Sequence, residues 1–543
     1  MVFARRSTTL LAAIIASCAM VLSLTACTSD NKTVVDGQTT VTSNSAGGVA
    51  VFTPSDGITL NQQMPLNKWA KLVPDLTKAL VDAGFKKGDI NHTTSDSLAK
   101  QSRAIQDFVV DHLSNNTTDD SGIAIAPDNM TLLVAPVVEA DASTRQYGDY
   151  VSQNLSTNDV TDEGATSDGE SSEDDSSKDD SSNTESDSTA SDEQAQAVDR
   201  LVSSLKLAKE SGMHVVLLGN SIEGYKPDAF VKFSDAQTIG KLQAEKMVSK
   251  LKLDKASKDN PKYIEVLLPY TAMDEKGNAN DSTFAQEAFR GIWQVLGSYY
   301  QKGVVESPSG TLDGKSTEND WQAVAYDAAK EGSTAKVLDK RLAKTDGQST
   351  LTRIDGIITM NDYIASEVVK ELDDLGYTGS AADINPQITI SGIVGNITGK
   401  KDLSRDAVPD PIKSPENDNA NDSSSSDDDA DKDTSASDKD RDSQWPLVTG
   451  YGAYVSNIPS IVNGKQWMTG MEDRQTIATD IAQACAKLNK DEALNSMPSI
   501  RNSEVGGVKK IPTISEPLLA VSASNLKSAL IDPGYISLAD AGL

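Results

Sequence analysis

Cysteine is scarce in this chain of 543 residues, which contains three. Cys18 and Cys27 lie close to the N-terminus, so Cys485 is the one cysteine beyond residue 27. A disulfide within the main part of the chain is therefore excluded, and its stability has to come from a packed core.

Histidine is equally scarce, and the motifs of common enzyme classes are missing. His92, His112 and His214 do not have the spacing of a His-Glu-x-x-His metal site, and no Walker loop is present. Cys485 lies on an apolar helical face, where packing is expected rather than reactivity. The sequence thus predicts no enzyme activity, no metal site and no cofactor.

Basic residues are outnumbered, with 50 Lys and Arg against 80 Asp and Glu and a net charge of −30. Residues 158–193 hold 14 acids and one Lys, and residues 414–443 hold 11 acids and three bases, which gives −13 and −8. Such polar, charged segments cannot offset chain entropy, so we expect disordered inserts, either plain spacers or binders of cations or cell-wall polymers. Nucleic-acid binding is not expected, because a basic, aromatic-rich stripe is absent.

Long apolar runs are also rare, and the clearest one, 10–24, follows Arg5 and Arg6 at the N-terminus. It is too short to span a bilayer comfortably and ends in small residues, which predicts a removable signal peptide. Leu24-Thr25-Ala26-Cys27 looks like a bacterial lipobox. We therefore expect a lipid-modified, acylated Cys27 that anchors the chain on the outer face of the cell membrane. An ordinary signal peptide with a chance cysteine is the alternative.

What the sequence does contain, beyond residue 48, is a regular alternation of two patterns. Short apolar runs such as 214–218 and 356–359 predict buried strands, and helical spacing as in Leu72, Leu76 and Leu80 predicts helices between them. This alternation predicts parallel sheets covered on both faces. Because a single sheet would be very wide, we predict an α/β fold of two doubly wound parallel-sheet lobes joined by a hinge. Ligands bind such sheets at the carboxyl ends of the strands.

The predicted organisation assigns every part of the chain. Strands are also expected at 122–126, 229–233, 263–268, 387–391 and 447–449, with helices beginning after Asp128 and covering 323–342. The predicted parts are a signal peptide (1–26), a tether (27–48), an N-terminal lobe (49–224) with an acidic insert (156–197), a C-terminal lobe (225–395), a second acidic insert (396–443) and hinge-crossing segments that complete both lobes (444–543).

Four stretches carry a family resemblance. They are 229–245, 357–362, a third that begins at 449–450 and resumes over 463–474, and 518–535. In their order and spacing they resemble the sugar-binding receptors of ABC transporters with the type I periplasmic-binding-protein fold, especially the xylose and multiple-sugar group. The resemblance runs from Ala50 to the C-terminus, apart from the two inserts. It implies a sugar site between the lobes, built from planar polar side chains and aromatic rings.

The resemblance also implies individual binding residues. Trp69 matches a family Trp, with Lys68 where an Arg is common, and Asp235 and Asp362 match family acids at the cleft. The hinge-side segments contribute Tyr451 and Asp473. A core position for Trp69 and a helix-capping role for Asp362 are the alternatives.

The chain departs from the family pattern at four places. Gly219-Asn220 replaces Asp-Arg, Gly450-Tyr451-Gly452 replaces Gly-Gln-Asp, and Glu472-Asp473 replaces Lys-Asp. The fourth departure is a blurred Asp-Asn-Asn-Ala element within 278–283. Several bidentate hydroxyl binders are thus missing, so no particular sugar is predicted.

Together these patterns predict a monomeric, lipid-anchored solute-binding protein. We expect it to capture a small solute of the carbohydrate class and to deliver it to an ABC permease. The alternative is a non-transporting surface or sensory protein that kept the fold but lost the sugar site.

Overall fold

The structure is a computed structural model, which describes residues 34–35, 38–39, 46–55, 65–115, 125–138, 146–151, 153–156, 184–273, 280–343, 350–382 and 444–543. Several predicted parts lie outside these residues. They are the signal peptide, Cys27, the predicted strand 387–391, the second acidic insert and most of the first insert. The chain divides into two compact units, Met1–Asn44 and Ser45–Leu543. In the first, β1 (Val34–Val35) pairs antiparallel with β2 (Gln38–Thr39).

The first lobe is built on a seven-stranded sheet whose strands are parallel, except for one antiparallel pair at an edge, β17 and β18. Three central strands are buried almost throughout, as their apolar sequences predict. In spatial order the strands are β17 (Ile500–Val505), β18 (Val508–Ser515), β9 (Ala229–Lys232), β7 (His214–Leu218), β5 (Met130–Val134), β3 (Gly48–Pro54) and β4 (Ile90–Ser95).

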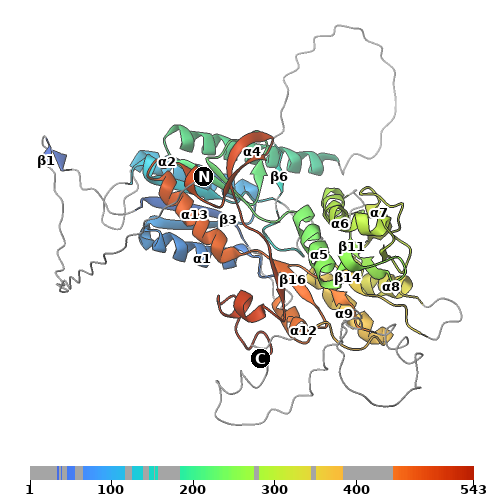
Figure 1. Ribbon diagram of the computed structural model, residues 1–543. Helices are drawn as coiled ribbons and strands as arrows, with labels where there is room; N and C mark the ends of the chain where they lie inside the picture. Colours follow the sequence, from blue (N-terminus) through green and yellow to red (C-terminus); the bar gives the residue numbers. More distant parts are fainter. Residues whose placement is uncertain are drawn as a thin grey trace, which may run out of the picture. The chain divides into compact units, whose positions relative to one another are not determined.

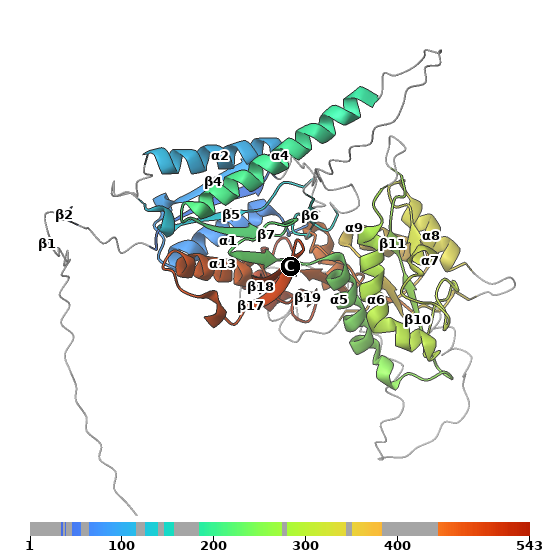
Figure 2. The same ribbon diagram turned by 90° about the horizontal axis from the view of Figure 1, so that it is seen from above.

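Helices cover both faces of this sheet (Figures 1 and 2). On one face α1 (Trp69–Asp82) packs beside α13 (Arg474–Leu488), and on the other α2 (Leu98–Asn115) packs beside α4 (Thr184–Glu210). The residues of α1 at helical spacing, Leu72, Leu76 and Leu80, are buried, so the sequence periodicity marks the face that packs on the sheet.

The second lobe has a smaller sheet of four parallel strands, β12 (Val305–Glu306), β10 (Lys262–Val266), β14 (Gly356–Ile358) and β15 (Leu447–Val448). One core forms with α5 (Ala236–Leu251) and α6 (Thr283–Gln301), and another with α8 (Ser333–Arg341) and α9 (Asp362–Leu375). Both sheets thus carry helices on both faces, and the predicted fold class of two doubly wound lobes is confirmed.

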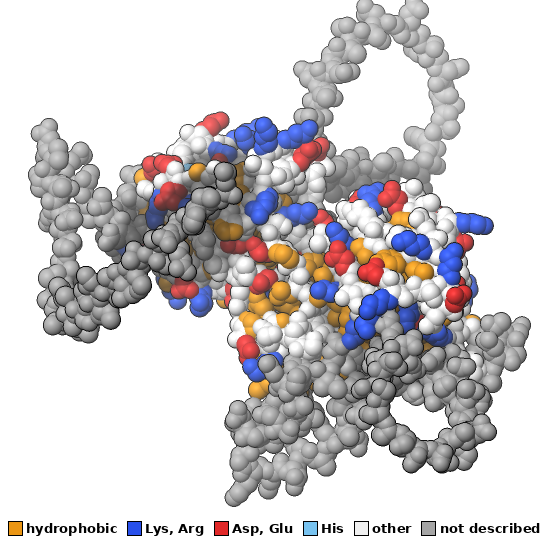
Figure 3. All heavy atoms as spheres, in the orientation of Figure 1, with side chains coloured by type: hydrophobic (Ala, Val, Ile, Leu, Met, Phe, Trp, Pro, Cys, Tyr) orange, Lys and Arg blue, Asp and Glu red, His pale blue; other side chains and the backbone are white. Residues whose placement is uncertain are grey.

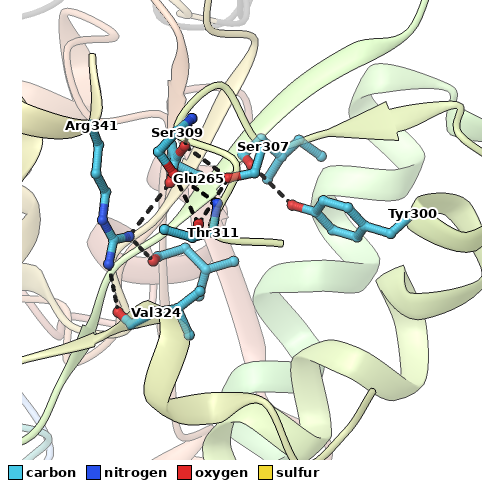
Figure 4. A network of polar contacts seen from close by, with 9 residues as sticks. Glu265, Tyr300, Ser307, Ser309, Thr311, Val324 and Arg341 are labelled. Atoms are coloured by element: carbon cyan, nitrogen blue, oxygen red, sulfur yellow. Dashed lines mark hydrogen bonds and ion pairs between the residues drawn. The ribbon is translucent and has the colours of Figure 1, made fainter. Parts of the chain in front are cut away.

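A buried ion pair organises the second lobe (Figure 4). Glu265, in β10, is fully buried, and Arg341 Nη1 lies 3.4 Å from its Oε2 atom. Ser307 Oγ and the Ser309 amide each donate to Glu265 Oε1 at 2.8 Å. Because the carboxylate is paired and hydrogen-bonded, its burial is compensated, and the loop after β12 is held against the sheet.

The chain passes between the lobes three times. The first crossing leads from β9 into α5, the second from β16 (Met468–Met471) into α13, and the third from β18 into β19 (Leu519–Ser522). Strands β16 and β19 pair antiparallel, and Figure 3 shows hydrophobic side chains gathered over this region. Since β9 still belongs to the first sheet, the chain leaves that lobe at Phe233, later than the boundary predicted after residue 224.

Two local predictions were wrong. A strand, β5, stands where a helix was predicted after Asp128, because a short apolar run reads alike in a buried strand and a buried helix. The helix predicted over 323–342 is divided into α7 (Trp321–Val324), β13 (Ala325–Tyr326) and α8, which begins after Gly332 at φ 69°. Strand β13 pairs in parallel with β11 (Leu268–Pro269).

Strand β4 and the hairpin β17–β18 were not predicted. They lie at the two edges of the seven-stranded sheet, where β4 is mostly exposed and polar and so lacks a hydrophobic pattern. Over the described residues, no helix combines the length and hydrophobicity needed to cross a bilayer. The remaining short elements include β6 (Asn154–Leu155), β8 (Ser221–Ile222) and α12 (Ile458–Val462).

Candidate functional site

The predicted binding residues lie near the points where strands end and the chain changes lobe. Asp235 follows β9, Asp362 follows β14, Tyr451 follows β15 and Asp473 follows β16. In parallel sheets the carboxyl ends of the strands share one edge, which is where such folds bind ligands.

Trp69 forms an aromatic cluster with Tyr150 and Phe233. The Trp69 ring centroid lies 5.0 Å from that of Tyr150 and 5.8 Å from that of Phe233, and Tyr150 stacks on Phe233 at 4.7 Å. Trp69 is only 3% exposed and belongs to the core of the first lobe. The ring supports this edge of the sheet, and its contact with a ligand stays a prediction.

Lys68 is joined to Asp149, a residue that the sequence analysis missed. Lys68 Nζ lies 2.7 Å from Asp149 Oδ1, and the Trp69 amide donates to Asp149 Oδ2 at 3.1 Å. Both side chains are largely buried, at 17% and 19% exposed. The Asp149 carboxylate thereby holds both the backbone at the start of α1 and the Lys68 ammonium group in place.

The segment around Asp149 also reaches the second lobe. Tyr147 packs in the core of that lobe, with ring centroids 4.7 Å from Phe284 and 6.3 Å from Tyr451. Gln146 accepts hydrogen bonds from Asn361 Nδ2 at 3.0 Å and, through its carbonyl, from the Tyr454 hydroxyl at 2.7 Å. With aromatics at only 5% of the chain, the pair of tyrosines at 147 and 150 is the signal that could have marked this segment.

Asp362 is fully buried and accepts three hydrogen bonds. Its Oδ2 binds the Tyr454 amide at 2.9 Å and Thr469 Oγ1 at 2.8 Å, and its Oδ1 binds Gln466 Nε2 at 2.7 Å. Burial raises the pKa of Asp362 to about 6, although these hydrogen bonds oppose the shift. Asn361, and not Asp362, caps α9 by accepting from the Ile364 amide. The Asp362 carboxylate therefore joins α9, β16 and the segment after β15, while its contact with a ligand stays a prediction.

Asp235 and Asp473 are helix caps in this structure. Asp235 accepts from the Thr238 amide at the start of α5, and Asp473 accepts from the Thr476 amide at the start of α13. Although burial alone would raise it, hydrogen bonds from Thr238 and Lys232 lower the pKa of Asp235 below its ordinary value. Both acids therefore lie beside the crossings as helix caps. Their contact with a ligand stays a prediction.

Tyr451 is fully buried between the two lobes. Its hydroxyl lies 2.5 Å from Ser234 Oγ and donates to Glu472 Oε1 at 3.3 Å, and the Ser234 amide donates to the same Oε1 at 2.6 Å. Burial raises the pKa of Glu472 to about 7 and also raises that of the Tyr451 hydroxyl. Tyr451 and Glu472 both stand where the family pattern has other residues, and the two side chains are hydrogen-bonded to each other.

The predicted residues form two connected groups. Lys68 and Trp69 share Asp149. The Asp362 amide donates to the Tyr451 carbonyl at 3.0 Å, and the Tyr451 hydroxyl reaches the two crossings that contain Asp235 and Asp473. The chemistry assembled here is that of amides, hydroxyls and carboxylates beside aromatic rings, which suits hydroxyl-rich solutes. Over the described residues, no three His, Cys, Asp or Glu side chains gather as metal ligands would.

A separate hollow of about 380 Å³ lies on the second lobe. It is lined by Lys246, Ser249, Lys250, Lys252 and Trp467. None of the six predicted binding residues lines it, so we do not assign it to the site.

No protein-family description and no curated protein matches the chain. Among solved structures it is similar to an ABC transporter solute-binding protein from Clostridium phytofermentans with bound β-D-glucose, at 17% identity and a TM-score of 0.44, covering 91% of this chain and 99% of the other.

A carbohydrate transporter solute-binding protein from Chloroflexus aurantiacus, in complex with D-glucose, is similar at 18% identity and a TM-score of 0.43, covering 92% and 98% of the two chains. A sugar ABC transporter protein from Actinomyces odontolyticus is similar at 10% identity and a TM-score of 0.43, covering 89% and 97%. At such scores the fold class rests on the strand order of this chain itself.

Proposed function

We propose that the protein is an extracytoplasmic solute-binding lipoprotein, which captures a small carbohydrate between its two lobes for delivery to an ABC permease. The observation that supports capture most directly is the meeting of polar side chains from both lobes where strands end. Gln146 with Asn361, and Ser234 with Tyr451, are such pairs. A ligand that contacts both sides stabilises the closed arrangement and shifts the population toward it.

The polar groups at this edge pair with one another in the structure described. A sugar hydroxyl both donates and accepts, so it can replace such partners without leaving a buried group unpaired. The aromatic rings nearby offer flat apolar faces for the C–H side of a sugar. This combination favours a carbohydrate over a purely apolar solute.

Calorimetric titration and melting-temperature measurements with mono- and disaccharides test the proposal. A ligand at a hundred times its dissociation constant adds about 2.7 kcal/mol to the free energy of unfolding. We expect Lys68→Ala to weaken binding and Lys78→Ala, at an exposed position of the same helix, to leave it unchanged. Absence of heat and of a melting shift with every sugar would contradict carbohydrate capture and favour the non-transporting alternative.

Anchoring through Cys27 is a separate part of the proposal. It is supported by the sequence Leu24-Thr25-Ala26-Cys27. We expect the wild-type chain to incorporate radiolabelled palmitate and to sediment with membranes, and Cys27→Ala to do neither. Membrane association of Cys27→Ala equal to that of the wild type would contradict the anchor and leave the capture proposal untouched.

A further inference from the structure

A buried triangle of hydrogen bonds joins two of the three crossings. Ser234 lies in the first crossing, between β9 and α5, and Glu472 lies in the second, between β16 and α13. Tyr451, in the segment after β15, contacts both through its hydroxyl. The three residues are 3%, 1% and 0% exposed, respectively. The triangle therefore ties together the segments that have to move relative to each other if the lobes open.

We propose that this triangle is a proton-operated hinge latch, in which neutral Glu472 holds the crossings together and ionised Glu472 favours opening of the lobes. The Ser234 amide and the Tyr451 hydroxyl both donate to Oε1 of Glu472. A proton on Oε2 therefore leaves both hydrogen bonds in place. The neutral form fits the buried site without an uncompensated charge.

The charges around Glu472 favour its neutral form. Asp235, in the first crossing, is negative and is paired with Lys232 at 2.9 Å. Arg474, two residues further along, directs its guanidinium to Asp75 at 2.6 Å. From the segment before α1, a neutral amide faces Glu472, because Asn67 Oδ1 accepts from the Glu472 amide at 3.4 Å. Among the described contacts of the Glu472 carboxyl group, none is an ion pair with Lys or Arg.

The pKa of Glu472 supports the latch and gives its direction. Burial raises it to about 7 from an ordinary value of 4.5; hydrogen bonds from Ser234 and Tyr451 oppose this shift, and the charge of Asp235 adds to it. Opening admits water and returns the pKa toward its ordinary value. The closed form then binds the proton more tightly, so its advantage is complete below about pH 4.5 and is lost as pH rises through about 7.

The expected effect is large enough to measure. Between about pH 5 and pH 7 the ratio of open to closed molecules should rise about sixfold for each pH unit, and about fortyfold in total. Asp362 is a second buried acid with a pKa of about 6, so pH alone does not isolate Glu472. The variant Glu472→Gln isolates the effect of Glu472, because Gln keeps an acceptor oxygen and cannot ionise.

Single-molecule energy transfer in the full chain measures the opening directly. Dyes on Gln106→Cys in α2 and Lys340→Cys in α8 report the separation of the lobes, in a Cys27→Ser background. Cys485 is fully buried, which protects it from labelling. No sugar is added, so the result is independent of whether carbohydrate capture is correct.

We expect the wild type to open as pH rises from 5 to 7.5 and Glu472→Gln to stay closed throughout. Tyr451→Phe should open more at every pH while keeping the slope, which preserves the test if Glu472→Gln fails to fold. Glu492→Gln, an exposed Glu paired with Lys487, should follow the wild type. A Glu472→Gln slope equal to that of the wild type, or lobes whose separation does not change with pH, would overturn the latch.

Discussion

At the scale of single residues, Asp362 shows how a predicted ligand contact can also be a structural acceptor. Its carboxylate binds one backbone amide and two side-chain donors, all in segments that follow β15. A side chain in this position holds the C-terminal part of the second lobe together.

Asp362→Ala should destabilise the protein strongly. It leaves the Tyr454 amide, Gln466 Nε2 and Thr469 Oγ1 without their acceptor in a buried site, and we expect a loss of about 3 kcal/mol in the free energy of unfolding. Urea denaturation followed by circular dichroism measures it. Asp96→Ala, at an exposed residue paired with Lys100, is the matched control and should keep the wild-type midpoint. An unchanged midpoint for Asp362→Ala would show that the network is unimportant for stability.

At the scale of secondary-structure elements, the caps connect the helices to the crossings. Asp473 accepts from the Thr476 amide at 3.2 Å and from Thr476 Oγ1 at 2.8 Å, at the N-terminus of α13. An acceptor at this position satisfies a helix donor that otherwise has no partner. The same residue was predicted to bind ligand, so cap and ligand roles have to be separated.

Asp473→Ala should lower the free energy of unfolding by about 1 kcal/mol, because the cap is lost. Asp473→Ser keeps an acceptor oxygen and should retain most of that stability. Thermal melts of both variants, together with sugar titrations, distinguish the two roles. Weakened binding in both variants would support a ligand contact through the carboxylate, and full binding in both would leave Asp473 as a cap.

Helices α5 and α6 approach each other through two glycines. A Cβ atom on Gly291 would lie 2.0 Å from the carbonyl oxygen of Gln237, and one on Gly240 would lie 2.2 Å from that of Ala288. Such distances are far below van der Waals contact with backbone that cannot rotate away. The close packing therefore depends on the absence of side chains at these positions.

Gly291→Ala should cost about 2 kcal/mol, even though Ala is the better helix former, because the clash forces the two helices apart. Melting temperature and urea denaturation provide the measurement. Gln294→Ala, at an exposed position of the same helix, should be nearly neutral. Stabilisation by Gly291→Ala would contradict the close crossing of α5 and α6.

At the scale of the whole molecule, the acidic segment 414–443 carries a net charge of −8 and lies outside the described residues. The described residues on either side of 383–443, the stretch that contains this segment, lie close together, because the Trp445 amide donates to the Thr378 carbonyl at 2.8 Å. The described fold is therefore continuous around this position.

Deletion of 414–443 should leave the melting temperature within about 2 °C of the wild type, because this segment contains no large apolar side chain that could contribute to a core. The chain retains flanking residues to close the loop. Calorimetry measures the melting temperature, and circular dichroism checks the helix content. A large loss of stability would show that the segment packs on the lobes and would contradict its interpretation as a spacer.

The fold class could be predicted from the sequence because buried parallel strands and amphipathic helices leave strong local patterns. Strands β7 and β14 and helices α1, α5 and α9 were found in this way. The edge strand β4 has no such pattern, and β5 was misread because its short, mostly apolar run suits either element. Six candidate site residues could be named, but their partners Asp149, Ser234 and Glu472 were not assigned as site residues.

By itself the sequence determined the two-lobed α/β class, the near absence of cysteine in the fold and the lipobox-like signal, since each depends on local order or composition. Only the tertiary structure decided that Asp362 is a buried acceptor, that Asn361 caps α9 and that Tyr451 bonds to Glu472 across the crossings. The bond from Gln466 to Asp362 joins residues 104 apart along the chain, and the bond from Tyr451 to Glu472 joins residues 21 apart. Whether two such side chains meet depends on how the sheets pack, which no local pattern contains.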